Sequence, residues 1–277
     1  MVWLVLACSS PPPIRVEEPA RSSAVVAGDS GADSGGDSGG DSGVDTGPLE
    51  LGEPCDPTAN TCADGALCCT ACCSPDSPSV CTLADPDGVC PLPDLSIDAT
   101  RATGHLTLET ISVAADSCMI EEACVGGTGD RKVLRFDTTT PNLGTADLIL
   151  GPPEATPEFF EWSECHDHYH YSGYAEFTLR DAGGSVVGSG HKQAFCVRDS
   201  EPWVPEQEGQ VPRYNCGFQG LTVGWADTYT WNLDCQWVDV TDLPAGDYTL
   251  ALEVNPGRAF PEKSFDDNRL ELPVTLP

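Results

Sequence analysis

The positions of the cysteines divide this chain into segments that must be stabilised in different ways. Of 15 cysteines in 277 residues, one is Cys8, eight lie in residues 51–92 and six lie in residues 93–277. So many cysteines are typical of exported proteins, because disulfides form and persist in oxidising compartments. The eight cysteines of residues 51–92 and the six cysteines of residues 93–277 can each pair completely within their own segment. Cys8 is then the one cysteine left over.

The first eight residues are apolar and end in Cys8. They resemble the end of a bacterial lipoprotein signal, in which the cysteine is lipidated after cleavage; a plain secretory or disordered start is the alternative. We therefore expect an exported protein, lipid-anchored to the bacterial outer membrane or cell surface, or otherwise secreted. No apolar run reaches the roughly 20 residues of a membrane span, so only the lipid on Cys8 would attach the chain to a membrane.

Residues 9–50 are predicted to be a disordered acidic tether. Three consecutive prolines at 11–13 are followed by repeated Asp, Ser and Gly between Gly28 and Gly47. This composition buries too little apolar surface to offset the loss of chain entropy on folding, and its like charges keep it extended.

Residues 51–92 are predicted to be a small module held together by disulfides. Its apolar residues are too few for a core of their own. The eight cysteines are Cys55, Cys62, Cys68, Cys69, Cys72, Cys73, Cys81 and Cys90, and the sequence does not choose among their many possible pairings. Zinc at the cluster of residues 68–73 is the alternative; in an exported chain we favour four disulfides.

Residues 93–277 are predicted to form an all-β domain. Short apolar runs alternate with Gly and Pro, and no long segment has helical periodicity. Strands are expected near 132–136, 147–150, 166–179, 186–197, 235–240, 248–254 and 270–274, with a hairpin turn at 181–184. The expected fold is an antiparallel β-sandwich with long loops and little helix.

The net charge restricts the partners. The chain has 44 Asp and Glu against 13 Lys and Arg, a formal net charge of −31. An acidic surface repels phosphates, which argues against nucleic acid as a partner. Amines or basic polypeptides are favoured, although an acidic exported surface without such a partner would have the same composition.

Three of the five histidines, His166, His168 and His170, stand at alternate positions. On a strand, a period of two would place all three on one face. Three imidazoles make an open metal site that suits copper, zinc, iron or nickel. Three surface histidines in an acidic stretch are the alternative.

Lys192 is one of only three lysines and lies in an otherwise apolar predicted strand. A charged amine is costly to bury without a partner. The side chain therefore either reaches water or acts chemically as a neutral amine with a lowered pKa.

Several motifs follow one another in an order that resembles the lysyl oxidase family over roughly residues 93–275. They are Cys118-x-x-Glu-Glu-x-Cys124, Glu161-Trp162, the Cys-His-x-His-Tyr-His of 165–170, Gly190-His191-Lys192, Phe195-Cys196, Gln219-Gly220-Leu221, Asp227-Thr228-Tyr229, Asp234-Cys235-Gln236-Trp237 and Asn255-Pro256. Separate motifs in a fixed order are far more specific than the histidine pattern alone.

The resemblance implies a copper amine oxidase with His166, His168 and His170 as copper ligands. It also implies a lysine tyrosylquinone cofactor built from Lys192 and Tyr229. Such an enzyme converts a primary amine or peptidyl lysine, with molecular oxygen, to an aldehyde, hydrogen peroxide and ammonia. Asp227 is the candidate base that removes the α-proton, because on a strand it would share a face with Tyr229; fixing a turn is its alternative role.

The resemblance further implies a calcium site and two disulfides. The possible calcium ligands are Asp94, Leu95, Glu262, Asp267 and Asn268. The implied disulfides are Cys118–Cys124 and Cys165–Cys216. Trp225 stands where the family usually has the partner of the cysteine at 235, so Cys196–Cys235 is expected by elimination. The family's histidine downstream of the metal motif is replaced by Glu176.

Two other functions remain open at this stage. One is a non-catalytic copper-binding adhesion or scaffold module that never forms the quinone. The other is an unrelated cupin-like enzyme that uses the three histidines alone. Only the amine oxidase requires both Lys192 and Tyr229.

Overall fold

The computed structural model describes residues 48–59, 61–70, 78–190 and 196–277. The predicted signal, nearly all of the predicted tether, Cys8, Cys72, Cys73 and Lys192 lie outside the described residues. None of the described helices is long and apolar enough to cross a membrane.

The cysteine-rich segment contains one small sheet and is stapled by disulfides. Strand β1 (Ala66–Thr70) pairs antiparallel with β2 (Ser79–Leu83). Three disulfides join the six described cysteines of this segment: Cys55–Cys68, Cys62–Cys81 and Cys69–Cys90. The prediction of a disulfide-rich N-terminal segment is confirmed for these residues. Its boundary at residue 92 stays a prediction.

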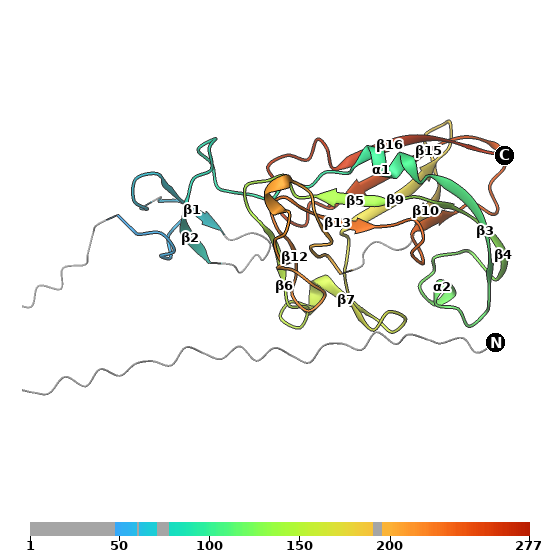
Figure 1. The fold of residues 1–277 in the computed structure, drawn as a ribbon, viewed down its shortest axis with the longest axis horizontal. Helices are drawn as coiled ribbons and strands as arrows, with labels where there is room; N and C mark the ends of the chain where they lie inside the picture. The colour runs from blue at the N-terminus through green and yellow to red at the C-terminus, as the bar shows by residue number, and fades with distance from the viewer. Residues whose placement is uncertain (1–47, 60, 71–77, 191–195) are drawn as a thin grey trace, which may run out of the picture. The chain divides into compact units, whose positions relative to one another are not determined.

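Short antiparallel strands make up most of the regular secondary structure in the remaining described residues (Figure 1). The four-stranded sheet has the order β10-β9-β15-β16, formed by Val186–Gly190, Ala175–Arg180, Gly246–Val254 and Arg269–Leu276. One three-stranded sheet has the order β14-β4-β3, formed by Trp237–Asp239, Gly129–Arg135 and Thr107–Val113. The other has the order β11-β13-β5, formed by Glu201–Pro202, Trp225–Tyr229 and Thr138–Pro141.

Two two-stranded sheets and a few short helical turns complete the described elements. Strand β12 (Gln219–Leu221) pairs with β6 (Leu148–Gly151), and β7 (Phe160–Ser163) pairs with β8 (His168–Tyr171). The helices are α1 (Ala99–Gly104), α2 (Cys118–Glu121) and the 3₁₀ turns η1 (Pro157–Phe159) and η2 (Pro205–Gln207). The prediction of an all-β antiparallel fold with little helix is therefore confirmed.

One apolar core joins these sheets. Strand β16 alternates strictly, with Leu272, Val274 and Leu276 buried and the residues between them exposed, so it covers the core with one face. Phe177 of β9 meets Phe136, which follows β4, with ring centroids 5.0 Å apart and nearly perpendicular planes. Such an edge-to-face contact adds to the area that both rings bury.

The predicted strand boundaries hold where no turn interrupts the apolar run. The runs near 132–136, 147–150, 248–254 and 270–274 correspond to β4, β6, β15 and β16. The run 166–179 is wrong as one strand, because Gly173 has a φ of 78° between β8 and β9. The run 235–240 shortens to β14. The run 186–197 contains β10 up to Gly190, and its residues 191–195 lie outside the described residues.

The hairpin turn predicted at residues 181–184 is confirmed between β9 and β10. The side-chain oxygen Oδ1 of Asp181 accepts hydrogen bonds of 2.9 Å from the backbone N–H groups of Gly183 and Ser185. Gly184 adopts a φ of 83°, a conformation that L-residues with a side chain rarely take.

Candidate functional site

The three histidines of the metal motif come from one β-hairpin. His168 and His170 are on β8, where they share a face, but His166 lies in the turn of residues 164–167 that precedes the strand. The expectation that all three stand on one strand is therefore wrong for His166, because the chain must reverse there. Asp167, with a φ of 57°, takes the left-handed conformation in that turn.

The turn nevertheless brings the three imidazole rings together. Ring centroids are 5.8 Å apart for His166 and His168, 5.5 Å for His166 and His170, and 5.0 Å for His168 and His170. All three residues are half-buried. Nitrogen donors gathered in this way fit a metal that prefers imidazole, and copper is one such metal.

Glu122, just after α2, contacts His166 through its side chain. Its Oε2 lies 3.0 Å from Nε2 of His166, and its Oε1 accepts a hydrogen bond of 2.6 Å from the hydroxyl group of Ser163. Glu122 belongs to the motif Cys118-x-x-Glu-Glu-x-Cys124, and nothing in the sequence assigns it a role.

Asp227 and Tyr229 stand two residues apart on β13, where they are paired with Thr140 and Thr138 of β5. Asp227 is 0% exposed, and its Oδ1 accepts a hydrogen bond of 3.0 Å from the hydroxyl group of Ser200. The half-buried Tyr229 donates its hydroxyl hydrogen to the backbone carbonyl of Cys196, at 2.8 Å.

Burial sets the acidity of both groups. It raises the pKa of Asp227 to about 7, against the opposing effects of the nearby Tyr229 hydroxyl group and of the hydrogen bond from Ser200. Burial also raises the pKa of the Tyr229 hydroxyl, and the nearby Asp227 carboxylate adds to that rise. A carboxyl group with a pKa near neutrality can accept a proton and release it again at physiological pH.

Gln219 links the histidine hairpin to the chain around Tyr229. It is 0% exposed, its side-chain N–H donates to the carbonyl of Tyr169 at 2.9 Å, and its Oε1 accepts from the N–H of Val197 at 2.9 Å. Tyr169 stands between two of the histidines, and Val197 follows the Cys196 that receives the Tyr229 hydroxyl. This buried amide therefore fixes the two halves of the site relative to each other.

The family model of lysyl oxidase matches residues 93–276. The chain belongs to the lysyl oxidase family. Lysyl oxidase homolog 2A of Danio rerio is 35% identical over 187 residues, which cover 64% of this chain and 24% of that relative. Lysyl oxidase homolog 3 of Homo sapiens is 36% identical over 166 residues, covering 56% and 21%. Lysyl oxidase homolog 1 of Homo sapiens is 35% identical over 190 residues, covering 64% and 32%. The chain therefore spans no more than about a third of these relatives.

The disulfides of this lysyl oxidase-family domain differ from all three predicted pairs. The structure joins Cys118 to Cys165, Cys124 to Cys235 and Cys196 to Cys216, with Cα–Cα distances of 5.7, 5.3 and 5.0 Å. The predictions Cys118–Cys124, Cys165–Cys216 and Cys196–Cys235 are therefore wrong. Only cysteines whose Cα atoms come within about 7 Å can bond, and the tertiary fold sets those distances.

The six described disulfides, together with the family membership, indicate an extracellular protein.

Trp225, which stands at a usual cysteine position of the lysyl oxidase family, is 3% exposed in the core, and its indole N–H donates to the side-chain carbonyl of Gln207 at 3.0 Å. Glu176 is exposed on β9 opposite Glu253.

The residues predicted to bind calcium come together from two distant parts of the chain. The buried Glu262 carboxylate accepts hydrogen bonds from the N–H of Leu95 at 2.6 Å and from the side-chain amide of Asn268 at 2.7 Å. The Oδ1 atom of Asn268 is buried and has no hydrogen-bond partner among the described residues. Burial raises the pKa of Glu262.

Asp94 lies beside the same group. Burial raises the pKa of Asp94, and the negative charge of Asp267 adds to the effect, although the N–H of Ser264 donates to Asp94 at 3.0 Å. Carboxylate and amide oxygens of this kind match the donors that calcium takes. Calcium binding itself stays a prediction.

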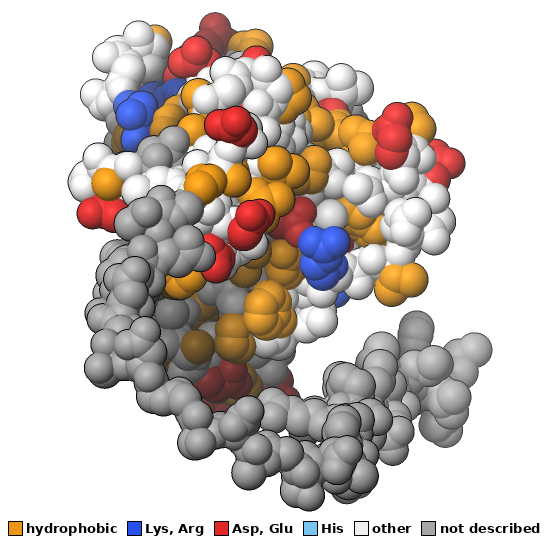
Figure 2. Space-filling model, turned by 90° about the vertical axis from the view of Figure 1, so that its left-hand side faces the viewer, with side chains coloured by type: hydrophobic (Ala, Val, Ile, Leu, Met, Phe, Trp, Pro, Cys, Tyr) orange, Lys and Arg blue, Asp and Glu red, His pale blue; other side chains and the backbone are white. Residues whose placement is uncertain are grey.

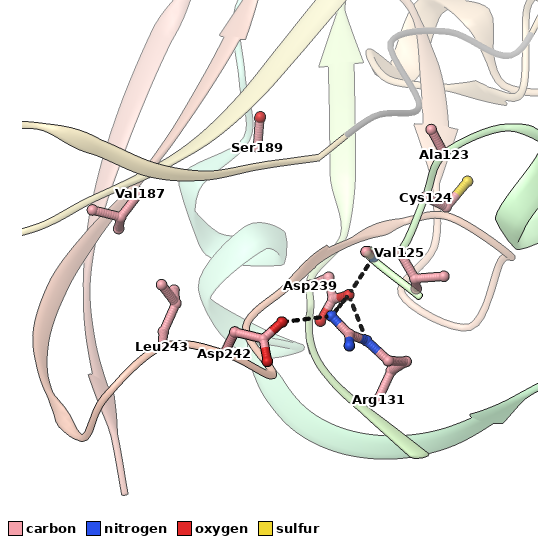
Figure 3. A pocket seen from close by; sticks show the side chains of 10 residues that line it. Ala123, Cys124, Val125, Arg131, Val187, Ser189, Asp239, Asp242 and Leu243 are labelled. Atoms are coloured by element: carbon pink, nitrogen blue, oxygen red, sulfur yellow. Dashed lines mark hydrogen bonds and ion pairs between the residues drawn. The ribbon is translucent and has the colours of Figure 1, made fainter. Parts of the chain in front are cut away.

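A separate cavity of about 410 Å³ lies between the loop after α2, β4, β10, and the end of β14 with the loop that follows it (Figure 3). Arg131 faces it and forms ion pairs with Asp239 at 2.7 Å and with Asp242 at 3.1 Å. The cavity lining includes Cys124 but none of the predicted copper ligands, and neither Asp227 nor Tyr229. It is therefore distinct from the candidate site.

Proposed function

We propose that this chain is a copper-dependent amine oxidase that converts primary amines or peptidyl lysine to aldehydes. The observation that carries the proposal is the buried bridge at Gln219, which connects the hairpin of the three histidines to the segment that receives the Tyr229 hydroxyl. A structural metal site would not require a half-buried tyrosine and a fully buried carboxylate on a strand connected to it in this way.

Copper held by His166, His168 and His170, and the lysine tyrosylquinone formed from Lys192 and Tyr229, would supply the oxidation of the amine by molecular oxygen, with hydrogen peroxide and ammonia released. Lys192 precedes Cys196 by four residues in the sequence. Four residues of extended chain span at most about 14 Å, and this short distance supports Lys192 as the partner of Tyr229.

The Asp227 carboxylate is the proposed base. It accepts the proton from the substrate carbon next to the amine nitrogen, a task that suits a pKa near the operating pH. The hydrogen bond from Ser200 to Oδ1 holds the carboxyl group in a fixed orientation. Burial keeps water away from the group and so maintains its raised pKa.

The acidic surface supports a cationic substrate. Figure 2 shows acidic side chains spread over the visible face with few basic side chains among them, in keeping with the net charge of −31. A negative field attracts protonated amines and speeds their encounter with the protein. Lipid anchoring through Cys8 and export to a bacterial surface remain proposals that rest on the sequence alone.

Phenylhydrazine labelling of the copper-loaded, aerated full chain tests the function. We expect labelling and amine-dependent release of hydrogen peroxide in the natural chain, and neither in Lys192→Arg. The variant should still bind copper, because it leaves the histidines in place. A natural chain that binds copper but is never labelled would instead be a copper-binding surface module.

A further inference from the structure

Glu122 lies in a short loop that is bonded covalently to both halves of the candidate site. Cys118, before it, is joined to Cys165, the residue that directly precedes His166. Cys124, after it, is joined to Cys235, six residues beyond Tyr229. The two disulfides therefore hold the Glu122 backbone in place relative to the histidine turn.

Hydrogen bonds also hold the side chain of Glu122 in place. Its Oε1 accepts from the hydroxyl group of Ser163 at 2.6 Å, and that hydroxyl oxygen accepts from the backbone N–H of His166 at 3.2 Å. The carboxylate is thereby oriented with its other oxygen, Oε2, directed at the imidazole. The side chains of Glu122 and His166 are 19% and 22% exposed, so little water competes for either group.

The decisive distance is the 3.0 Å between Oε2 of Glu122 and Nε2 of His166. Nitrogen and carboxylate oxygen bind transition metals at about 2.0–2.2 Å. Copper(II) favours tetragonal sites with nitrogen and oxygen donors. Two such bonds at a right angle place their donor atoms about 2.8–3.1 Å apart. The observed 3.0 Å is a hydrogen-bond distance that two neighbouring ligands of one ion would also have.

We propose that Glu122 is a fourth protein ligand of the copper site, supplying one carboxylate oxygen beside the three imidazoles. The 3.0 Å contact of the same oxygen with Nε2 of His166 keeps the imidazole oriented. An anionic oxygen lowers the net charge of the copper(II) centre and raises its affinity relative to three neutral nitrogens alone. This inference rests on the proposed copper site and extends its ligand set.

Copper(II) titration of the full chain, followed by electron paramagnetic resonance, tests the assignment. Glu122→Gln keeps the size of the side chain and its hydrogen bond with Ser163 but removes the anionic oxygen. We expect its copper affinity to fall by at least the roughly 10–100-fold that loss of an outer-shell partner costs, and its parallel hyperfine splitting to change. Glu121→Gln is the matched control, because Glu121 is an exposed neighbour that should leave both readouts unchanged.

A second variant separates ligation from orientation. Ser163→Ala removes the hydrogen bond to Oε1 and leaves Oε2 in place, so the affinity should fall less and the spectrum should keep its shape. Mapping of the Cys118–Cys165 and Cys124–Cys235 bonds confirms that each variant has folded. If Glu122→Gln folds and matches the natural chain in affinity and spectrum, the fourth ligand is refuted while the three-histidine site stands. A natural chain without copper affinity refutes this inference together with the proposed function.

Discussion

The hydroxyl group of Tyr229 donates a hydrogen bond of 2.8 Å to the backbone carbonyl of Cys196. The two residues are 33 positions apart in the sequence. The bond brings the end of β13 against the segment that follows Lys192 in the chain. It therefore holds the Tyr229 hydroxyl group against Cys196, which follows Lys192 by four positions in the sequence.

Replacing this tyrosine tests its chemical role. Tyr229→Phe removes the hydroxyl group that the quinone requires, so amine oxidation should fall below detection while copper stays bound. Loss of the hydrogen bond to Cys196 should cost about 1 kcal/mol of unfolding free energy. Peptide mass spectrometry should find a fragment joining the Lys192 and Tyr229 peptides in the natural chain and none in the variant. If the Lys192 and Tyr229 peptides of the natural chain are always detected as separate fragments, the proposed link between the two residues is contradicted.

The copper ligands predict a second result. His168→Ala removes one of three imidazoles whose ring centroids lie within 6 Å of each other, so copper and amine oxidation should be lost together. Metal analysis of the dialysed protein measures the bound copper, and release of hydrogen peroxide measures the amine oxidation. His105→Ala, outside the cluster, is the control. Full activity in copper-free His168→Ala would rule out the assignment.

Asp227 predicts a pH dependence of activity. Because burial raises its pKa to about 7, kcat/KM should increase with pH through about 7 as the carboxyl group loses its proton and becomes a base. Asp227→Asn should lower kcat by about 100-fold or more and leave copper bound. A pH profile that is the same in the variant and in the natural chain would assign the base to another residue.

The same group predicts a pH dependence of stability. The unfolded carboxyl titrates near its ordinary pKa of about 4, and the folded one near about 7. Between these values the folded chain holds more protons than the unfolded chain, so stability falls as pH rises. The difference amounts to roughly 4 kcal/mol for this one group. Thermal unfolding of Asp227→Asn should show a smaller decrease in Tm between pH 5 and pH 8 than the natural chain does.

The proposed calcium site predicts a ligand-dependent change in stability. Calcium should raise the Tm of the full chain, and a chelator should reverse the effect, because an ion bound only to the folded state stabilises it. Asp94→Asn should weaken the response without abolishing folding, since Glu262 keeps its hydrogen bonds to Leu95 and Asn268. An unchanged Tm over the millimolar range would rule out a calcium site of useful affinity.

The Cys124–Cys235 disulfide predicts a global stability effect. It closes a loop with a sequence separation of 111 residues, and loops of this size lose much conformational entropy in the unfolded chain when cross-linked. Replacing both cysteines by Ala should therefore lower the unfolding free energy by about 2–5 kcal/mol. The same change at Cys196 and Cys216, with a separation of 20, should cost less. Equal losses would argue against the entropic account.

Local patterns in the sequence were enough to predict the strands, the metal motif and the family of this protein. Alternation of apolar residues and the turn residues of 181–184 predicted the long antiparallel strands, because side-chain direction and turn conformation depend on near neighbours. The spacing of His166, His168 and His170 identified the metal motif, and its ordered companions indicated the family that the comparison confirms.

Only the tertiary structure decided which distant groups meet. Cys118 bonds to Cys165 rather than to Cys124, Gln219 bridges two segments of the site, and Glu122 lies against His166. None of these contacts follows from spacing, because each depends on how separate strands and loops pack. The raised pKa of Asp227 has the same origin, since burial is a property of the assembled core.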